Sequence, residues 1–296
     1  MSDSKGVGIT TVVGCLQAGE PLMGVSPSGW WGTDDASVDQ KYFLANQLGW
    51  RKGLPLFGDT LRSFAHFDYK EVRRRADEWK MRIEIPSDLP SGGVLMISQY
   101  KEMLNWLYGG TRVDHLFNYP TFWLKMGISF SSHMYSAEPV ISIATESKTK
   151  DVVFITRWTE PLSGLAILRQ IEKIEESMTY CSHEYDGVQI PCVLADMNVD
   201  LSWILGIRNK NWFIAWAAQK ILFGMNQIGF AVQEDTGVLS LKGGSALTKP
   251  VPYVVSPNGE SFLFWRRRPG VDFPLSIYQF TRGDFKDPGN LRNIIS

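Results

Sequence analysis

Residues 79–100 (WKMRIEIPSDLPSGGVLMISQY) place the strongest constraint on what this chain can fold into. Residues 79–85 alternate apolar and charged side chains, which is the period-2 pattern of a strand with one buried face. Pro86 cannot donate a hydrogen bond to a neighbouring strand, and the Pro/Ser/Gly run at 87–93 is typical of a turn. Residues 94–97 are apolar on both faces, as in a strand inside a packed sandwich. The pattern predicts a mainly β fold.

Most of the remaining periodic segments also predict strands, with two helices among them. Residues 162–178 carry Leu165, Leu168, Ile171 and Ile174 on one helical stripe, and residues 212–223 form a second candidate helix before Gly224. The predicted strands cover residues 121–130, 139–144, 151–158, 188–193, 199–205, 230–233, 238–241, 251–255, 262–265 and 275–280. We therefore predict an antiparallel jelly-roll sandwich with one or two flanking helices.

The first part of the chain shows no sustained period, because glycines and prolines interrupt short apolar pieces up to about residue 60. A long ordered loop is uncommon inside a compact domain. We therefore expect residues 1–55 to be an extended amino-terminal arm with one short helix at residues 34–48, and residues 56–296 to form the jelly-roll domain with a helical insertion near 162–178.

Composition limits the possible classes of protein. The 296 residues have a formal net charge of −1, so the whole chain creates no field that would attract nucleic acid or a membrane. The three cysteines, an odd number, are expected to be reduced thiols in a non-secretory setting. We find no signal peptide and no run of about 18 apolar residues, and therefore predict no membrane span.

The best candidate for a metal site or a nucleophile is Cys181, followed by His183 and Glu184, with Asp186 close behind. A thiolate beside an imidazole can attack a substrate, and Cys with His can bind zinc. A structural zinc site needs four ligands, however, and no second cluster occurs in the sequence. A surface loop is the alternative interpretation.

Other fragments of catalytic motifs are incomplete. His133 follows two serines, but the sequence has no Gly-x-Ser-x-Gly elbow, so a histidine at a strand end is the simpler interpretation. The glycine pair at residues 6–8 lacks the helix and acidic residue of a nucleotide site. Glu172, Glu175 and Glu176 are expected on the solvated face of their helix. We predict no catalytic residues, cofactor or metal, and hence a protein that is not an enzyme.

Two arginine triplets are candidates for contact with nucleic acid. They consist of Arg73, Arg74 and Arg75, and of Arg266, Arg267 and Arg268. Arginine binds phosphate well, and Trp79 and Trp265 nearby could stack on bases. The alternative is that these charges protect edge strands from aggregation.

Residues 43–67 (FLANQLGWRKGLPLFGDTLRSFAHF), followed by MRIEIPSDLPSGGVLMISQY, resemble the opening of picornavirus-like capsid proteins. In that family an irregular arm leads into a strand with a wet face, a Pro/Ser/Gly loop and a buried strand. The segment from PTFWL to VVFITRW follows the same order of strands, so the resemblance covers about residues 30–160. The resemblance implies a structural subunit of the virion, which self-assembles around an RNA genome. Its partners would be copies of itself or sister capsid proteins, and it would lie in the host cytoplasm during assembly.

Two alternatives remain open. A carbohydrate-binding β-sandwich would also be rich in tryptophan, and this chain has 11 of them. Residues 220–229 (KILFGMNQIG) resemble the hinge approach of serpins, and residues 262–264 resemble the carboxyl strand of that family, although no alanine-rich hinge follows Gly229. We take the capsid subunit as the working prediction.

Overall fold

The computed structural model describes residues 5–88, 92–113, 118–181, 185–232 and 251–295. The helices in these ranges are α1 (Ile9–Met23), α2 (Val38–Arg51), α3 (Tyr69–Glu78), α4 (Ala166–Ser177) and α5 (Arg292–Ile295), with the 3-10 turns η1 (Pro27–Gly29), η2 (Leu54–Thr60), η3 (Ser202–Ile204) and η4 (Arg282–Asp284). None of these helices is long and apolar enough to cross a membrane.

The strands of these ranges follow in chain order. They are β1 (Lys5–Val7), β2 (Leu61–His66), β3 (Leu95–Tyr100), β4 (Glu102–Asn105), β5 (Thr111–Val113), β6 (Thr121–Leu124), β7 (Ile128–His133), β8 (Ser136–Ala144), β9 (Val152–Arg157), β10 (Thr179–Cys181), β11 (Val188–Pro191), β12 (Val193–Val199), β13 (Arg208–Asn209), β14 (Trp212–Phe213), β15 (Gln219–Met225), β16 (Gly229–Val232), β17 (Tyr253–Val254), β18 (Phe262–Arg267) and β19 (Leu275–Phe280).

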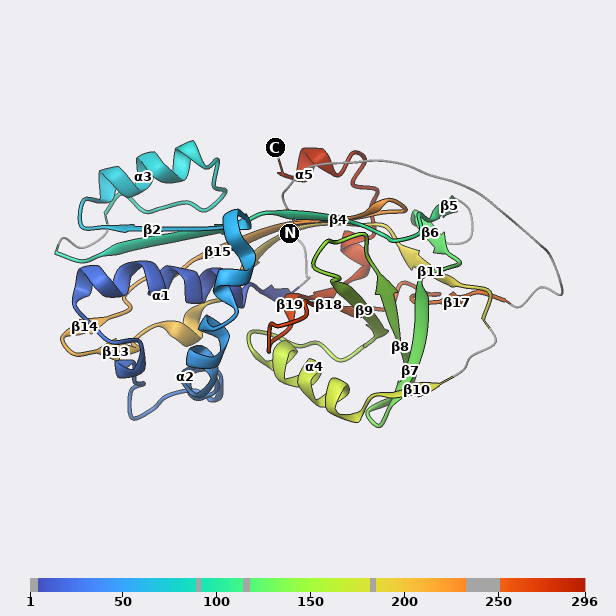
Figure 1. The fold of residues 1–296 in the computed structure, drawn as a ribbon, viewed down its shortest axis with the longest axis horizontal. Coiled ribbons are helices and arrows are strands. Elements are labelled where there is room, and N and C mark those ends of the chain that lie inside the picture. The colour runs from blue at the N-terminus through green and yellow to red at the C-terminus, as the bar shows by residue number, and fades with distance from the viewer. Residues whose placement is uncertain (1–4, 89–91, 114–117, 182–184, 233–250, 296) are drawn as a thin grey trace.

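These strands form three larger sheets and two strand pairs (Figure 1). An antiparallel seven-stranded sheet has the order β1-β19-β18-β9-β8-β7-β10. A four-stranded sheet has the order β12-β15-β16-β4, and another has the order β17-β11-β6-β5. β2 pairs with β3, and β13 pairs with β14.

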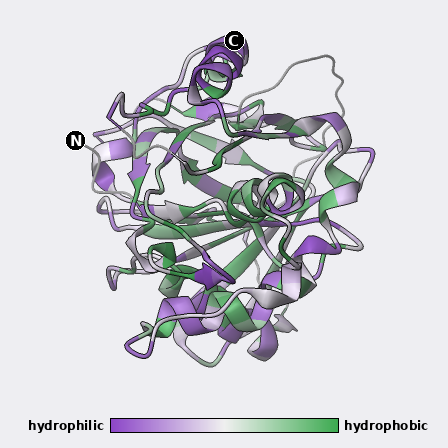
Figure 2. Cartoon of the chain, turned by 90° about the vertical axis from the view of Figure 1, so that its left-hand side faces the viewer, coloured by the Kyte–Doolittle hydropathy of each residue, from purple (hydrophilic) through white to green (hydrophobic). Residues whose placement is uncertain are grey.

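The seven-stranded sheet separates two hydrophobic cores, because its side chains alternate between its faces. On β18, Leu263 and Trp265 belong to the first core, which contains α1, α2 and α4. Phe262 and Phe264 belong to the second core, which is shared with β4, β12, β15 and β16. Hydrophobic residues accordingly gather on the inner strands and the central helix, and hydrophilic ones on peripheral loops and helices (Figure 2).

Helix α1 is buried beneath β2 and β3, which explains why its sequence looks irregular. A Cβ atom at Gly14 would lie 2.7 Å from Ser63 Oγ, and one at Gly19 would lie 2.2 Å from Met96 Sδ. These glycines therefore allow the helix to approach the strands closely, whereas in the sequence they look like loop residues. Gly24 ends the helix with a φ of 62°, a left-handed conformation that glycine adopts without strain.

Helix α4 confirms the helix predicted at residues 162–178. Its predicted stripe is buried, since Leu168, Ile171 and Ile174 are each 0% exposed and pack against the seven-stranded sheet. An amphipathic helix on a sheet needs only this stripe to be apolar, so its period of 3.6 residues is visible in the sequence.

The jelly-roll prediction is wrong, because the described residues form a mixed α/β fold with helices and several separate sheets. The predicted extended arm instead contains α1 and α2, both packed in a core. The strand predicted at 79–85 has no regular structure, and the helix predicted at 212–223 is replaced by β14 and the start of β15. The division of the chain at residue 55 falls inside η2 and stays a prediction.

The aromatic centre of the second core gives a test of this packing. Phe223 is fully buried, with its ring centroid 4.7 Å from that of Phe280, 5.0 Å from Phe264 and 6.0 Å from Phe230. We expect Phe223→Ala to lower the free energy of unfolding by about 3–5 kcal/mol in urea titrations, because it leaves a cavity. The matched change Phe213→Ala, at a side chain 63% exposed, should change it by less than about 0.5 kcal/mol.

Candidate functional site

The site is organised around β16, a short strand that lies between β15 and β4. It follows β15 through a tight turn in which Asn226 Oδ1 accepts a hydrogen bond from the Ile228 amide at 3.0 Å. A Cβ atom at Gly229 would lie 2.1 Å from the Leu104 carbonyl oxygen, so β16 begins at a position that only glycine fits. Phe230 is fully buried and stacks on Phe223, which fixes the strand in the second core.

The described part of β16 pairs with all of β4 but with only the last residues of β15. β16 pairs with β4 from Gly229 opposite Asn105 to Val232 opposite Glu102. β15 continues to Gln219, and the chain of β4 continues backwards into β3. On its outer side β15 pairs with β12, and on its outer side β3 pairs with β2. In the described part of the chain no strand pairing joins β3 to β15. A slot bordered by two strand edges therefore extends from the end of β16.

A mainly apolar cavity of about 200 Å³ occupies this slot. Its floor is α1, which contributes Val12, Cys15 and Leu16, and its walls are β3 and β15. Residues 81–83, which follow α3, line it from another side. Burial raises the pKa of the Cys15 thiol to about 12, so this cysteine stays protonated and is not an activated nucleophile.

Gln219 joins the far end of β15 to the start of α1. Its Oε1 accepts a hydrogen bond from the Gly8 amide at 2.9 Å, while its Nε2 donates to the Gly8 carbonyl at 2.9 Å and to Thr11 Oγ1 at 2.8 Å. Because α1 has no side-chain N-cap, this amide satisfies polar groups that the helix start would otherwise bury. These hydrogen bonds hold α1, the floor of the slot, against β15, one of its walls.

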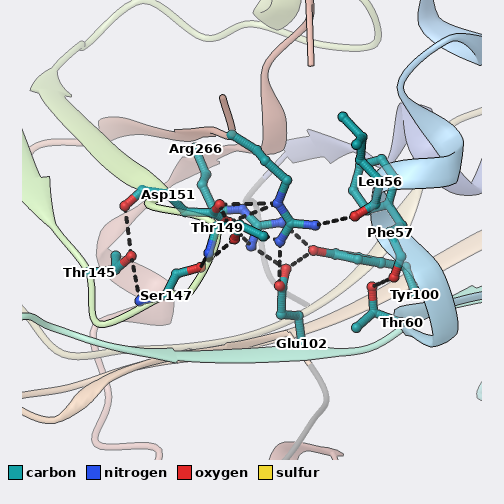
Figure 3. A network of polar contacts seen from close by, with 11 residues as sticks. Leu56, Phe57, Thr60, Tyr100, Glu102, Thr145, Ser147, Thr149, Asp151 and Arg266 are labelled. Carbon is teal, nitrogen blue, oxygen red and sulfur yellow. Dashed lines mark hydrogen bonds and ion pairs between the residues drawn. The ribbon is translucent and has the colours of Figure 1, made fainter. Parts of the chain in front are cut away.

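A cluster of buried charges lies beside the end of β16 (Figure 3). Glu102 begins β4, Arg266 comes from β18, Arg268 follows β18, and Asp151 precedes β9. Arg266 and Arg268 each bind both carboxylates, with Arg266 Nη1 2.9 Å and Arg268 Nη2 3.0 Å from Asp151 Oδ2. Arg266 is 0% exposed and Asp151 is 1% exposed, so these ions are screened little by solvent.

Tyr100, at the end of β3, connects this cluster to the wall of the slot. Its hydroxyl group donates a hydrogen bond to Glu102 and accepts one from Arg266. Burial raises the pKa of Tyr100 well above its ordinary value, and Arg266 opposes that rise. Burial by itself would lower the pKa of Arg266, but Tyr100, Glu102 and Asp151 raise it above its ordinary value. The arginine therefore stays charged, and the tyrosine stays neutral.

The structure separates the members of the second arginine triplet. Arg266 and Arg268 are 0% and 4% exposed, so their guanidinium groups are occupied inside the protein. Arg267 points to the other face of the sheet, where its Nε lies 2.8 Å from Glu175 Oε1. Nucleic-acid contact by this triplet stays a prediction, but two of the three side chains have no access to a phosphate in this conformation.

The first triplet lies on α3 among acidic neighbours. Arg74 forms ion pairs with Glu71 and Glu78. Arg75 Nη1 lies 3.2 Å from Glu78 Oε2. Arg73 donates a hydrogen bond to the Pro86 carbonyl. The local charge is thus largely neutralised, and nucleic-acid contact by Arg73, Arg74 and Arg75 also stays a prediction.

The described members of the other candidate sites lie in separate places. Cys181 is on β10, while His183 and Glu184 lie outside the described residues. His133 ends β7, where its Nδ1 accepts a hydrogen bond from the Tyr135 amide at 3.3 Å. Glu172 accepts a hydrogen bond from Tyr42. No group of three potential metal ligands occurs in the part of the chain that the structure describes.

No family model and no curated protein matches this sequence, but solved structures do. The mouse protein-Z dependent protease inhibitor has a TM-score of 0.53 and 11% identity, over 93% of this chain and 90% of that one. SRPN18 from Anopheles gambiae has a TM-score of 0.50 and 11% identity, over 97% of this chain and 93% of that one. Serpin48 from Tenebrio molitor has a TM-score of 0.42 and 12% identity, over 72% of this chain and 63% of that one.

The fold is serpin-like. The similarity to the first two of these structures extends over nearly the whole chain. The predictions of a capsid subunit, of self-assembly around RNA and of a place in the virion are therefore wrong, and the carbohydrate-binding sandwich loses its basis in the fold. The mouse neighbour is named as a protease inhibitor, and the absence of enzymatic activity in the present chain stays a prediction.

The slot was missed because it depends on strands from distant parts of the chain. Its best sequence signal was KILFGMNQIG at residues 220–229, which became β15, the turn and the start of β16. Ile221, Phe223 and Met225 alternate there with other residues and point into the second core. The preceding WFIAWAA masked this alternation by extending an apparently helical apolar run.

The start of β16 can be tested by filling the space beside Gly229. We expect Gly229→Ala to lower the free energy of unfolding by about 1–3 kcal/mol, because the new Cβ would press on the Leu104 backbone. Thermal unfolding measures the change, and hydrogen exchange should show faster exchange in residues 229–232. Gly49→Ala in α2, where a Cβ meets nothing within 4 Å, is the control and should be neutral or stabilising.

The buried cluster gives a second stability test. Arg266→Met keeps much of the side-chain volume but leaves Glu102 and Asp151 with only Arg268 as a buried counter-charge. We expect the free energy of unfolding to fall by about 3–5 kcal/mol in urea titrations. Arg74→Met, at an exposed ion pair on α3, should leave the unfolding midpoint unchanged. Equal effects of the two changes would contradict the assigned role of burial.

Proposed function

We propose that this protein inhibits serine proteases by inserting part of its own chain as a strand into the slot between β3 and β15. The observation that carries this proposal is β16, which lies between β15 and β4, while the start of β15 and the neighbouring strand β3 run on without pairing to each other in the described residues. The chain that follows Val232 starts at the mouth of the slot. Serpin loops insert into a sheet in this manner, and the serpin-like fold supports the proposal.

Extending the register gives each residue of the inserted strand its partners. Val232 is opposite Glu102, so residues 233–239 would run opposite residues 101–95 of β3 and the linking residue. Ala231 is opposite Gly224, so the same segment would run along β15 from Leu222 towards its start. Both edges of the slot would then gain backbone hydrogen bonds, each worth about 0.5–1.5 kcal/mol net.

The faces of the inserted strand also follow from β16. Phe230 and Val232 point into the second core, whereas Ala231 packs with Leu291 and Ile294 near α5. Because side chains alternate along a strand, even-numbered residues after Val232 would face the interior and odd-numbered ones the opposite face. Neighbouring strands lie about 4.8 Å apart, so an inserted strand needs about 9.6 Å between β3 and β15.

A protease would set off insertion by cutting the chain beyond residue 239. Attack by its serine breaks a peptide bond, releases a new amino terminus and leaves the upstream segment as an ester on the serine oxygen. Insertion of that segment then carries the attached protease away from the released terminus before water reaches the ester. The protease supplies all the catalytic groups, so this protein acts as an inhibitor and not as an enzyme.

The test is to incubate the protein with trypsin-like and chymotrypsin-like proteases at pH 5.5 and pH 7.5, and to locate the cut by mass spectrometry. We expect a cut within residues 240–250, loss of protease activity, and an unfolding temperature about 10 °C higher after cleavage, because new strand pairing adds several kcal/mol. A cut in this segment that leaves the protease active and the unfolding temperature unchanged at both pH values would overturn the proposal.

A matched pair of variants separates insertion from simple cleavage. Thr236→Arg would place a charge on the interior face of the inserted strand, whereas Gln233→Arg would place it on the opposite face. We expect the first variant to be cut as a substrate without gain in stability, and the second to behave like the unaltered protein.

A further inference from the structure

The cavity between β3 and β15 has an apolar interior. Met81 and Ile83 close it on the side of α3, where they pack against the small hydrophobic cluster of that helix. An interior of this kind favours an apolar group over water. The buried aliphatic side chains that line it come from several elements and include Val12, Leu16, Ile97, Ile204, Ile214 and Ile221.

The polar groups of this interior are already paired. The amide of Gln219 binds the backbone of Gly8 and the hydroxyl group of Thr11. Among the described residues that line the cavity, none has a buried side-chain nitrogen or oxygen atom without a hydrogen-bond partner. A ligand with polar groups along its length would lose hydrogen bonds to water without replacing them. The interior therefore suits a hydrocarbon group.

The size and shape of the cavity limit this hydrocarbon. An apolar cavity of about 150 Å³ stays dry and binds benzene, so a cavity of about 200 Å³ admits a body of about six to eight carbon atoms. The lining follows residues 94–100 of one wall and residues 217–222 of the other. A single hydrocarbon chain fits a space that runs along two strands.

The rim of the cavity has more positive than negative charge. Lys220 of β15 and Arg82 of the segment after α3 both line the cavity, and both pair with Asp196 of β12. Lys220 Nζ lies 3.4 Å from Asp196 Oδ1, and Arg82 Nη1 lies 3.5 Å from Asp196 Oδ2. No aspartate or glutamate is among the described residues that line the cavity. Two cations that share one carboxylate leave one positive charge for an anionic group.

Both cations lie across the cavity from its floor, α1. Lys220 points away from the second core, because the next residue, Ile221, points into it. Arg82 follows α3, which lies on the opposite side of β2 and β3 from α1 (Figure 1). The side chains of Arg82 and Lys220 are 46% and 29% exposed, so a ligand can reach them from solvent. The site thus has an apolar end and a cationic end.

We propose that this cavity binds a free medium-chain carboxylic acid, with its hydrocarbon chain directed towards α1 and its carboxylate between Arg82 and Lys220. Such a carboxyl group is ionised at pH 7.5, so it complements the positive rim. The inference is independent of the proposed inhibition, because it concerns the protein without an inserted strand.

The test is isothermal titration calorimetry of the full chain at pH 7.5 with hexanoate, octanoate and 1-octanol, each below the concentration at which it forms micelles. We expect one octanoate to bind per chain, about fifteenfold more tightly than hexanoate, because each buried methylene group strengthens binding about fourfold. 1-Octanol has the same chain length without the charge and should bind more weakly than octanoate.

Two matched variants should change the affinity for octanoate in opposite directions. Lys220→Gln leaves Arg82 and Asp196 in balance and should weaken binding about threefold to fivefold, whereas Asp196→Asn frees both cations and should tighten it by a similar factor. Neither change should alter the affinity for 1-octanol. Lys125→Gln makes the same change in net charge at the ion pair with Asp186, outside the cavity lining, and should have no effect.

A third variant tests the position of the hydrocarbon chain. Cys15→Phe places a ring in the cavity from α1 and should abolish binding of both octanoate and 1-octanol. Its unfolding temperature shows whether the fold is intact. If this variant does not fold, the opposite effects of Lys220→Gln and Asp196→Asn still locate the ligand at this rim.

Several results would overturn the proposal. They are no binding of octanoate, equal binding of octanoate and 1-octanol, equal affinities of Lys220→Gln and Asp196→Asn for octanoate, and undiminished binding by folded Cys15→Phe protein. Protease inhibition is measured separately, so each of these results leaves the proposed function standing.

Discussion

The pairing of β16 between β4 and β15 is the constraint on which the rest of the site depends. Gly229 allows the strand to approach Leu104 closely, and Phe230 anchors it among the aromatic rings of the second core. β16 lies between β4 and β15, and beyond its described residues β3 and the first part of β15 do not pair with each other in the described part of the chain. Unpaired strand edges favour the addition of another strand, which links this local packing to the proposed inhibition.

The buried charge cluster borders that site. Ion pairs taken out of water contribute little net stability, because desolvation offsets their attraction, but they tolerate few alternative arrangements. Here four charges from separate parts of the chain balance one another beside the mouth of the slot.

Sequence patterns predicted the elements whose burial is simple. Helix α4 has one buried stripe, and strands β18 and β19 were expected at residues 262–265 and 275–280. Helix α1 was missed because it is covered on several sides, so its apolar residues and close-approach glycines show no single period. Residues 79–85 alternate like a strand, yet they follow α3 as an irregular segment whose apolar side chains pack against β3 and its neighbours.

The sequence by itself determined the helix at residues 162–178, the strands at residues 262–265 and 275–280, and the likeness of residues 220–229 to a serpin hinge approach. It also placed two arginines at 266 and 268, where they looked like surface charges. Only the tertiary structure decided that these arginines are buried and that β3 and β15 face each other across a slot. The physical reason is that both features arise from contacts between residues more than a hundred positions apart, which no local pattern records.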